Sequence, residues 1–213
     1  IGLGRDHHVL EIGCGWGGFA EYAARHIGCK VTGITISREQ LAFGQRRIQA
    51  SGLSDRVDLK YCDYRDVNRQ YDRVVSIEMF EAVGEKYWPV FFDKLRTCLK
   101  PGGRAGLQII TIEDARFEAY RKNTDFIQRY IFPGGMLPSP NKIKEAVQAA
   151  KRYKRAAEAA KEEGANSGIG DLTALIGGPT TKKPEVNIYD ALRNASLAAL
   201  PHTMLADTQI WQL

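Results

Sequence analysis

The chain has 213 residues, 44% of them hydrophobic and 26% charged, a balance that excludes a mostly disordered, collagenous or coiled-coil protein. Thirty basic and 25 acidic side chains give a formal net charge of +5, which tolerates an anionic cofactor, nucleic acid or an acidic lipid surface and selects none of them. No apolar run approaches the ~18 residues that a transmembrane helix needs.

The first 140 residues alternate strand-like and helix-like segments. In chain order they predict a strand at His8–Ile12, a helix at Phe19–Ile27, a strand at Lys30–Thr35, a helix from an N-cap at Ser37 to about Ala50, strands at Val57–Cys62 and Asp72–Ile77, a helix at Tyr87–Leu99 and a strand at Arg104–Thr111. This rhythm is typical of a parallel sheet with helices on both faces, which binds ligands at the carboxyl ends of its strands.

The remaining chain has a different character. Asp114–Pro140 is rich in aromatic residues and arginine and favours a lid or substrate-binding insert, with a surface excursion as the alternative. Lys142–Gly164 predicts an Ala-rich helix, whose basic run Lys151–Arg155 suits a solvated face or contact with anionic lipid headgroups. Gly164–Pro184 has the composition of a linker, and Ile188–Leu200 predicts a further helix.

A glycine-rich loop, Gly13-Cys14-Gly15-Trp16-Gly17-Gly18, follows the first strand and opens the first helix. Glycines let the backbone turn tightly and let a ligand approach, and the helix start presents free N–H groups. Glu11, just before the loop, is suited to an ammonium group and would repel a pyrophosphate. The second strand ends in Thr35-Ile36-Ser37 without the acid that an NAD site expects, whereas Gln40 offers hydrogen bonds to ribose hydroxyls. Both features favour S-adenosyl-L-methionine as the cofactor.

Six segments resemble the cyclopropane-fatty-acyl-phospholipid synthase family, which includes the mycolic acid methyltransferases. They are LEIGCGWGG, VTGITISREQL, CDYRDV, YDRVVSIEMFEAVGEKYW, LKPGGRAGLQIITI and DFIQRYIFPGGMLPSP, and the resemblance covers about residues 7–147. It implies a Rossmann-like class I methyltransferase fold with a mainly parallel, doubly wound sheet, incomplete in this chain and followed by a helical C-terminal tail.

The resemblance also implies roles for single residues. Gly13, Gly15 and Gly17 would line the methionine end of the cofactor, and Thr35, Ile36 and Gln40 its ribose and adenine. Asp63 and Tyr64 match a loop that closes over the adenine, against which Ile77 packs. Glu81 matches a catalytic glutamate that helps to hold a bicarbonate ion, which serves as the base. Gln108 stands in the catalytic strand where the family commonly has a histidine; an amide can donate and accept hydrogen bonds but cannot titrate.

Two further departures concern the ends of the chain. The family's tyrosine- and cysteine-containing segment before the glycine loop has no counterpart in Ile1–His8, and a start without methionine suggests an excerpt. After about Val147 the resemblance ends, where two more sheet strands and a tyrosine-bearing helix are expected. Either the tail replaces those strands, or the sheet is left with five strands and an exposed edge.

We therefore expect a methyltransferase core over residues 1–147, with an acyl-binding insert at 112–140, and a tail of unknown role at 148–213. The predicted activity is methyl transfer from S-adenosyl-L-methionine to the double bond of an unsaturated phospholipid acyl chain, giving a cyclopropane or methyl-branched lipid. The alternatives are an inactive cofactor-binding module and a methyltransferase for a small molecule.

The expected partners are lipid, through peripheral membrane contact, and no nucleic acid, because there is no base-binding motif or basic stripe. The four cysteines are dispersed, which predicts neither a metal site nor a disulfide framework and favours the cytoplasm. They are Cys14, Cys29, Cys62 and Cys98.

Overall fold

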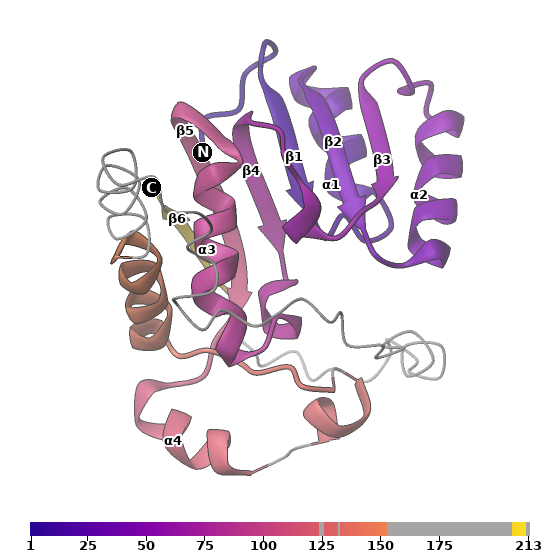
Figure 1. The fold of residues 1–213 in the computed structure, drawn as a ribbon. Coiled ribbons are helices and arrows are strands. Elements are labelled where there is room, and N and C mark those ends of the chain that lie inside the picture. The colour runs from indigo at the N-terminus through magenta and orange to yellow at the C-terminus, as the bar shows by residue number, and fades with distance from the viewer. Residues whose placement is uncertain (124–125, 132, 153–205, 212–213) are drawn as a thin grey trace, which may run out of the picture.

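One six-stranded sheet organises the computed structural model, which describes residues 1–123, 126–131, 133–152 and 206–211 (Figure 1). The strands are β1 His8–Ile12, β2 Lys30–Thr35, β3 Val57–Tyr61, β4 Tyr71–Ile77, β5 Leu99–Ile110 and β6 Ala206–Trp211. The helices are α1 Gly18–Tyr22, α2 Arg38–Ala50, α3 Trp88–Thr97 and α4 Asp114–Lys122, and residues 140–152 are also helical.

The strand order is β3-β2-β1-β4-β5-β6. The first five strands are parallel, as the sequence predicts, and β6 runs antiparallel to β5. The direction of strand succession reverses between β1 and β4. Ligands of open α/β sheets bind at the carboxyl ends of the strands beside such a reversal. The glycine loop leaves β1 at this point.

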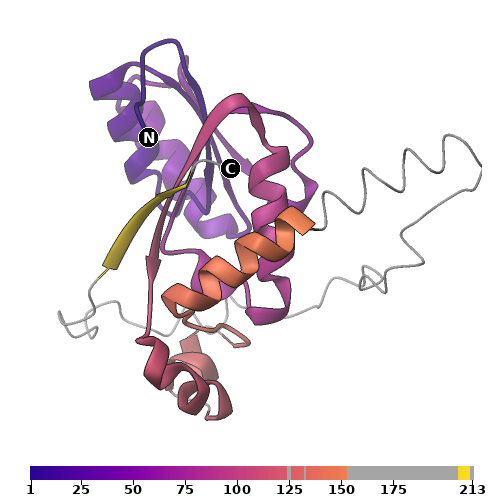
Figure 2. The ribbon, with the colours of Figure 1, turned by 90° about the vertical axis from the view of Figure 1, so that its left-hand side faces the viewer.

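Two hydrophobic clusters cover the two faces of the sheet. One cluster places α1, α2 and the helical turn at Ala23–Ile27 against the strands, through Ala20, Ile48 and Ala24 respectively. The other places α3 and the helical residues 140–152 against β4 and β5 (Figure 2). In that second cluster Phe91 and Leu95 of α3 are fully buried. The doubly wound arrangement is therefore present in the described chain.

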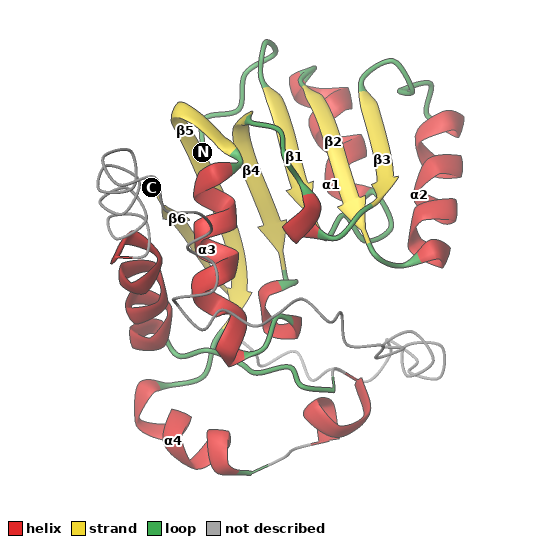
Figure 3. Ribbon diagram, in the orientation of Figure 1, coloured by secondary structure: helices red, strands yellow, loops and turns green. Residues whose placement is uncertain are grey.

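Most predicted elements are confirmed, with differences at their ends (Figure 3). Ser37 is the N-cap of α2, and its hydroxyl accepts a hydrogen bond from the Gln40 amide. The single helix predicted at Phe19–Ile27 is wrong in detail, because a π-helical turn at Ala23–Ile27 follows α1. The segment Pro101–Gly103 lies within β5, which begins at Leu99 and not at Arg104.

The tail contributes a strand that the sequence analysis does not predict. β6 pairs with β5 from Ala105↔Trp211 to Ile110↔Ala206, so the edge of β5 is covered. Of the two expectations for this edge, the structure supports replacement by the tail. Residues 140–152 confirm the start of the predicted helix at Lys142, whereas the rest of that helix, the linker and the helix at Ile188–Leu200 lie outside the described residues.

The insert after β5 is partly helical. It contains α4 and a π-helical turn at Ile127–Ile131, and it lies beyond the carboxyl ends of β4 and β5 (Figure 1). None of the described helices has the length and apolar character needed to cross a membrane.

Candidate active site

The glycine loop folds back over the end of β2. The amides of Gly13 and Cys14 both donate to the carbonyl of Ile34, at 3.0 and 2.9 Å. Gly13, Gly15 and Gly17 have φ values of 78°, 50° and 81°, in the left-handed region that favours glycine. A Cβ atom at Gly13 would lie 2.6 Å from Cγ of Met79. The loop is therefore pressed against the turn that follows β4.

Glu11 lies beneath this loop at 3% exposure. Its Oε2 has no hydrogen-bond partner among the described residues, although the Ala20 amide donates a hydrogen bond to the carboxyl group. Burial raises the pKa of Glu11 to about 8, and that hydrogen bond only partly offsets the rise. A buried acid without a cation is costly to ionise. The site is thus chemically suited to a positively charged group.

The side chains expected at the ribose are connected to each other. The Thr35 hydroxyl donates to Oε1 of Gln40 at 2.9 Å and accepts from the Ser37 amide at 3.1 Å. This leaves the Nε2 group of Gln40 as the donor that a hydroxyl could meet. Ile36 is 41% exposed beside them, which suits an apolar contact with a base or sugar.

Asp63 and Tyr64 follow β3 at the same edge of the sheet. The Asp63 carboxylate accepts from Nε and Nη2 of Arg65, at 3.0 and 2.7 Å, and from the Arg65 amide. The Tyr64 ring packs edge-on against Phe91, and burial raises the pKa of its hydroxyl to about 12. Ile77 packs at the edge of the cluster that contains α1 and α2.

Glu81 is the buried acid on the other side of the loop, at 6% exposure. It lies in the 3₁₀ turn Phe80–Ala82 after β4, and its Oε1 accepts from the Ile110 amide at the end of β5. Its Oε2 is buried without a partner among the described residues. Burial raises the pKa of Glu81, and the charge of Glu78 raises it further. Glu81 can therefore hold a proton or accept one.

Gln108 does not contact Glu81 directly. Its Nε2 donates to Oε1 of Glu78 at 2.8 Å, and its backbone carbonyl accepts from the Glu78 amide at 2.9 Å. Sequence reasoning missed both Glu78 and Met79. Their position inside the SIEMFEAVGE motif, three and two residues before Glu81, was the available signal.

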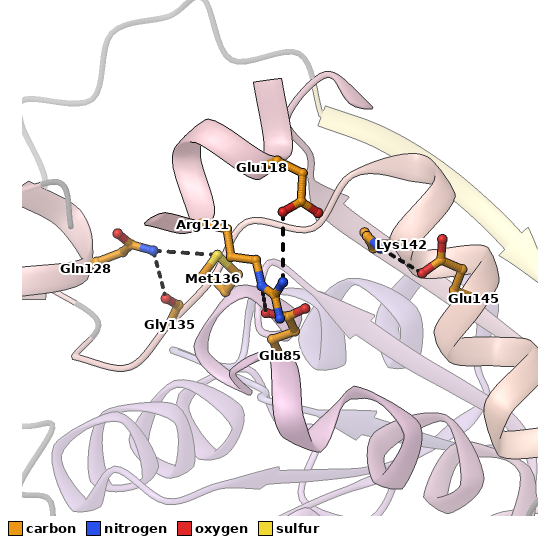
Figure 4. Close-up of polar contacts among 8 residues, drawn as sticks. All are labelled: Glu85, Glu118, Arg121, Gln128, Gly135, Met136, Lys142 and Glu145. Carbon is orange, nitrogen blue, oxygen red and sulfur yellow. Dashed lines mark hydrogen bonds and ion pairs between the residues drawn. The ribbon is translucent and has the colours of Figure 1, made fainter. Parts of the chain in front are cut away.

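The insert is attached directly to the turn that carries Glu81. The Met136 amide donates to the Glu81 carbonyl at 2.8 Å, and a Cβ atom at Gly84 would lie 2.9 Å from the Gly134 carbonyl oxygen. Figure 4 shows a further link, in which Arg121 of α4 pairs with Glu85 at 2.7 Å. Within the insert, Gln128 donates to the Gly135 carbonyl at 3.4 Å. The insert is thus joined to the segment that carries Glu81.

The described residues contain no cluster of three or more His, Cys, Asp or Glu side chains that could hold a metal ion. The arrangement instead provides a glycine loop, a hydrogen-bonding rim and two buried carboxyl groups on either side of the reversal between β1 and β4. Such a site suits a cofactor that carries a cation and a nucleoside, with an acid or base group beside it.

Comparisons with known proteins agree with this arrangement. Residues 1–160 match the family model described as mycolic acid cyclopropane synthetase. The chain is 46% identical over 142 residues to tuberculostearic acid methyltransferase UfaA1 of Mycobacterium tuberculosis, covering 67% of this chain and 33% of that protein. It is 42% identical over 139 residues to the cyclopropane-fatty-acyl-phospholipid synthase of Escherichia coli, covering 65% and 34%.

Solved structures show the same fold. Mycolic acid cyclopropane synthase CmaA1, in a complex with S-adenosylhomocysteine and CTAB, has a TM-score of 0.64 at 27% identity, covering 70% of this chain and 56% of that one. Cyclopropane synthase MmaA2 from Mycobacterium tuberculosis has a TM-score of 0.63 at 27% identity, with the same coverage. The chain spans about a third of the length of the curated relatives named above.

Proposed function

We propose an activity for this chain, which belongs to the mycolic acid cyclopropane synthetase family. The chain transfers a methyl group from S-adenosyl-L-methionine to the double bond of an unsaturated fatty acyl chain of a phospholipid. The product would be a cyclopropane or a methyl-branched lipid. Relatives with these activities in their names, and a structural neighbour bound to S-adenosylhomocysteine, support this proposal.

The observation that carries the proposal is the environment of Glu81. Glu81 has a buried carboxyl group with one unpartnered oxygen. Met79, two residues before it, packs against Gly13 of the cofactor loop, and the backbone carbonyl of Glu81 accepts a hydrogen bond from Met136 of the insert. A group of this kind is needed where a proton must leave a lipid that water must not reach. Among the described residues, no other buried carboxyl group lies on the insert side of the loop.

The cofactor would lie across the reversal between β1 and β4. When bound, S-adenosyl-L-methionine supplies a methyl group that its sulfonium already activates. Glu11 would balance the ammonium of its amino-acid end, and Gly13, Gly15 and Gly17 would let it approach the backbone. Thr35, Ile36 and Gln40 would meet the ribose and adenine, with Asp63, Tyr64 and Ile77 completing the rim.

The insert would receive the acyl chain. An alkene is a poor nucleophile, so it must be held close to the methyl group and in line with the bond that breaks. Its π electrons form the new carbon–carbon bond, and the other alkene carbon is left with positive charge. Loss of a proton from the new methyl group closes the ring, whereas loss from a neighbouring carbon leaves an alkene. A site closed by the insert would keep water from the charged carbon.

Bicarbonate fits the free oxygen of Glu81. With its raised pKa, the Glu81 carboxyl can donate a hydrogen bond to an anion or accept one from a protonated oxygen. A bound bicarbonate would supply the base, and Glu81 and Gln108 would be the residues of this chain that hold and orient the reacting groups.

The substrate also determines where the protein must work. An acyl chain of a bilayer lipid has to be reached from the membrane surface, so we propose peripheral contact with the membrane from the cytoplasmic side. Phe126 and Tyr130 of the insert are exposed large aromatic side chains and would be suited to an interfacial contact.

Incubation of the protein with S-adenosyl-L-methionine carrying a deuterated methyl group and with vesicles of an unsaturated phospholipid tests the proposal. We expect mass spectrometry of the released acyl chains to show the label, and none with saturated vesicles. Cofactor binding without any labelled lipid would instead favour an inactive cofactor-binding module. Labelling of a polar small molecule, but not of lipid, would favour the other alternative.

A further inference from the structure

Glu78 has an unusual backbone conformation at the end of β4. Its φ is 51°, and it is the only residue other than glycine with positive φ in the described part of the chain. This region is sparsely populated by residues with a side chain and persists where surrounding contacts maintain it. A glycine would adopt it without strain, so contacts around Glu78 must offset the conformational cost.

Glu78 forms two hydrogen bonds with Gln108, and the one between the side chains is exposed to solvent. The Glu78 amide donates to the Gln108 carbonyl at 2.9 Å, and Nε2 of Gln108 donates to Oε1 of Glu78 at 2.8 Å. Ile77 is the register partner of Gln108, so a continued strand would turn the next side chain to the opposite face of the sheet. The left-handed conformation ends that alternation and lets the carboxylate reach Gln108.

This pairing determines which end of the amide is bound. A carboxylate only accepts hydrogen bonds, so it takes the NH₂ end of Gln108 and leaves the carbonyl oxygen as the free end. A hydrogen bond to a charged acceptor is stronger than a neutral one and fixes the direction of the amide dipole. The free carbonyl is then a place of negative partial charge.

The pair lies beside Glu81. Ile110, two residues after Gln108 on the same strand, donates its amide to Glu81, and the charge of Glu78 raises the pKa of Glu81. Gln108 and Glu78 are therefore part of the environment in which the acyl chain would gain positive charge.

We propose that Glu78 is a positioning residue that orients the side-chain amide of Gln108, so that the amide carbonyl stabilises positive charge on the acyl chain after methyl transfer. This inference rests on the proposed function. It assigns to Gln108 the role of a fixed dipole, at a position where the family commonly has a histidine that can titrate. The carboxylate acts through Gln108 and need not touch the lipid.

The test uses Glu78→Gly, Glu78→Gln, Gln108→Leu and the Glu78→Gly/Gln108→Leu double variant. The control is Asp58→Asn, which removes an exposed carboxylate from β3 at the far edge of the sheet. Three quantities are measured: the melting temperature, the rate constant kcat with KM on unsaturated phospholipid, and the Kd of methyldioctylammonium in the presence of S-adenosylhomocysteine. This ammonium places one positive charge in the middle of an alkyl chain and resembles the charged lipid.

We expect Glu78→Gly to melt at the same or a higher temperature, because glycine relieves the positive φ. It should nevertheless lower kcat about tenfold with KM within threefold, and raise the Kd of the ammonium about tenfold. For Glu78→Gln, kcat and the Kd of the ammonium should lie between the values of Glu78→Gly and the wild type. The double variant should lose no more than the larger single loss, because both changes remove one coupled interaction.

The proposal is overturned if Glu78→Gly keeps both kcat and ammonium affinity within twofold of the wild type, or if the losses of the single variants add in the double variant. Absence of turnover by the wild-type protein would instead overturn the proposed function. The ammonium affinities would still decide the role of Glu78, because they require no methyl transfer.

Discussion

The two sides of the site are built from contacts of very different range. On the cofactor side, made of the loop Gly13–Gly18 with residues 35–40 and 63–65, the polar contacts of the rim join residues two to five positions apart. On the acceptor side, made of Glu78–Glu81 with Gln108, Ile110 and the insert, the hydrogen bonds join residues 29 to 55 positions apart. The rim of the cofactor side is thus assembled by local chain geometry, whereas the glycine loop is held by longer-range hydrogen bonds to Ile34 of β2.

The two sides also differ in backbone strain. The ribose rim pairs its own hydroxyl, amide and carboxylate groups before any ligand arrives. Each side has one buried carboxyl oxygen without a partner among the described residues, Oε2 of Glu11 and Oε2 of Glu81, but only the acceptor side also holds a residue other than glycine, Glu78, at positive φ. Unsatisfied and strained groups cost stability and are found where a fold serves chemistry. We therefore expect changes on the acceptor side to affect turnover more than folding.

Glu81→Gln should show the largest difference between an effect on turnover, which depends on the acceptor side, and an effect on cofactor binding. The substitution keeps the size of the side chain and removes its ability to exchange a proton, so we expect kcat to fall by about 10² to 10⁴. The Kd of S-adenosylhomocysteine, measured by calorimetry, should stay within threefold. Glu145→Gln, on the exposed surface of the helical residues 140–152, is the matched control. An equal loss of cofactor affinity in Glu81→Gln would show that the two sides are not separable.

Gly13→Ala should disrupt the point where the two sides meet. The new Cβ would lie 2.6 Å from Cγ of Met79, and φ is 78°. We expect about 2–3 kcal/mol of lost stability, part from the left-handed conformation and part from the clash, and a Kd for S-adenosylhomocysteine at least tenfold higher. Gly52→Ala, with φ of 67° and nothing within 4 Å, should lose only about 1–2 kcal/mol and bind normally. Similar behaviour of the two variants would argue against the packing of the loop on Met79.

Glu11 makes the cofactor side sensitive to pH. Because its folded pKa of about 8 is above the usual 4.5, the folded protein binds more protons than the unfolded chain between these values. The free energy of unfolding therefore falls as pH rises through this window, by about 1.4 kcal/mol per pH unit while Glu11 stays protonated only in the folded state. Denaturant titrations from pH 5 to 9 should show this slope in the wild type and its loss in Glu11→Gln.

Cofactor binding should lower the pKa of Glu11 again. An ammonium group beside Glu11 favours the charged carboxylate, so binding of S-adenosylhomocysteine near pH 7 should release close to one proton. Calorimetry in two buffers of different ionisation enthalpy measures that number directly. Glu11→Gln should release none and bind about tenfold more weakly. Equal proton release by the variant would show that another group titrates.

Arg121→Gln should have the smallest effect. The Arg121–Glu85 pair links the insert to the core, but it is substantially exposed, and pairs of this kind contribute about 0.2–1 kcal/mol. We expect a KM for lipid about twofold higher, unchanged kcat and a shift in melting temperature of a few degrees at most. Lys142→Gln removes a comparable pair with Glu145 and should leave KM unchanged. A large loss of kcat in Arg121→Gln would mean that the ion pair between the insert and Glu85 is required for methyl transfer.

The sequence by itself determined the local parts of this protein. The glycine loop after a buried strand, the Ser37 N-cap and the strand–helix rhythm all depend on neighbours along the chain, and each was correctly predicted. The motif resemblance also placed Glu81, Gln108 and the rim residues at the carboxyl ends of the strands, although their roles stay proposals.

Only the tertiary structure decided what surrounds those residues. Burial of Glu11 and Glu81, the pairing of Gln108 with Glu78 and the contact between Gly13 and Met79 arise when strands far apart in the chain become neighbours. The antiparallel strand β6 is a similar case, because the open edge of β5 selects its partner by backbone hydrogen bonds that carry little sequence signal. The unpaired oxygens and the raised pKa values follow from this burial, since the cost of a charge depends on the solvent and partners around it.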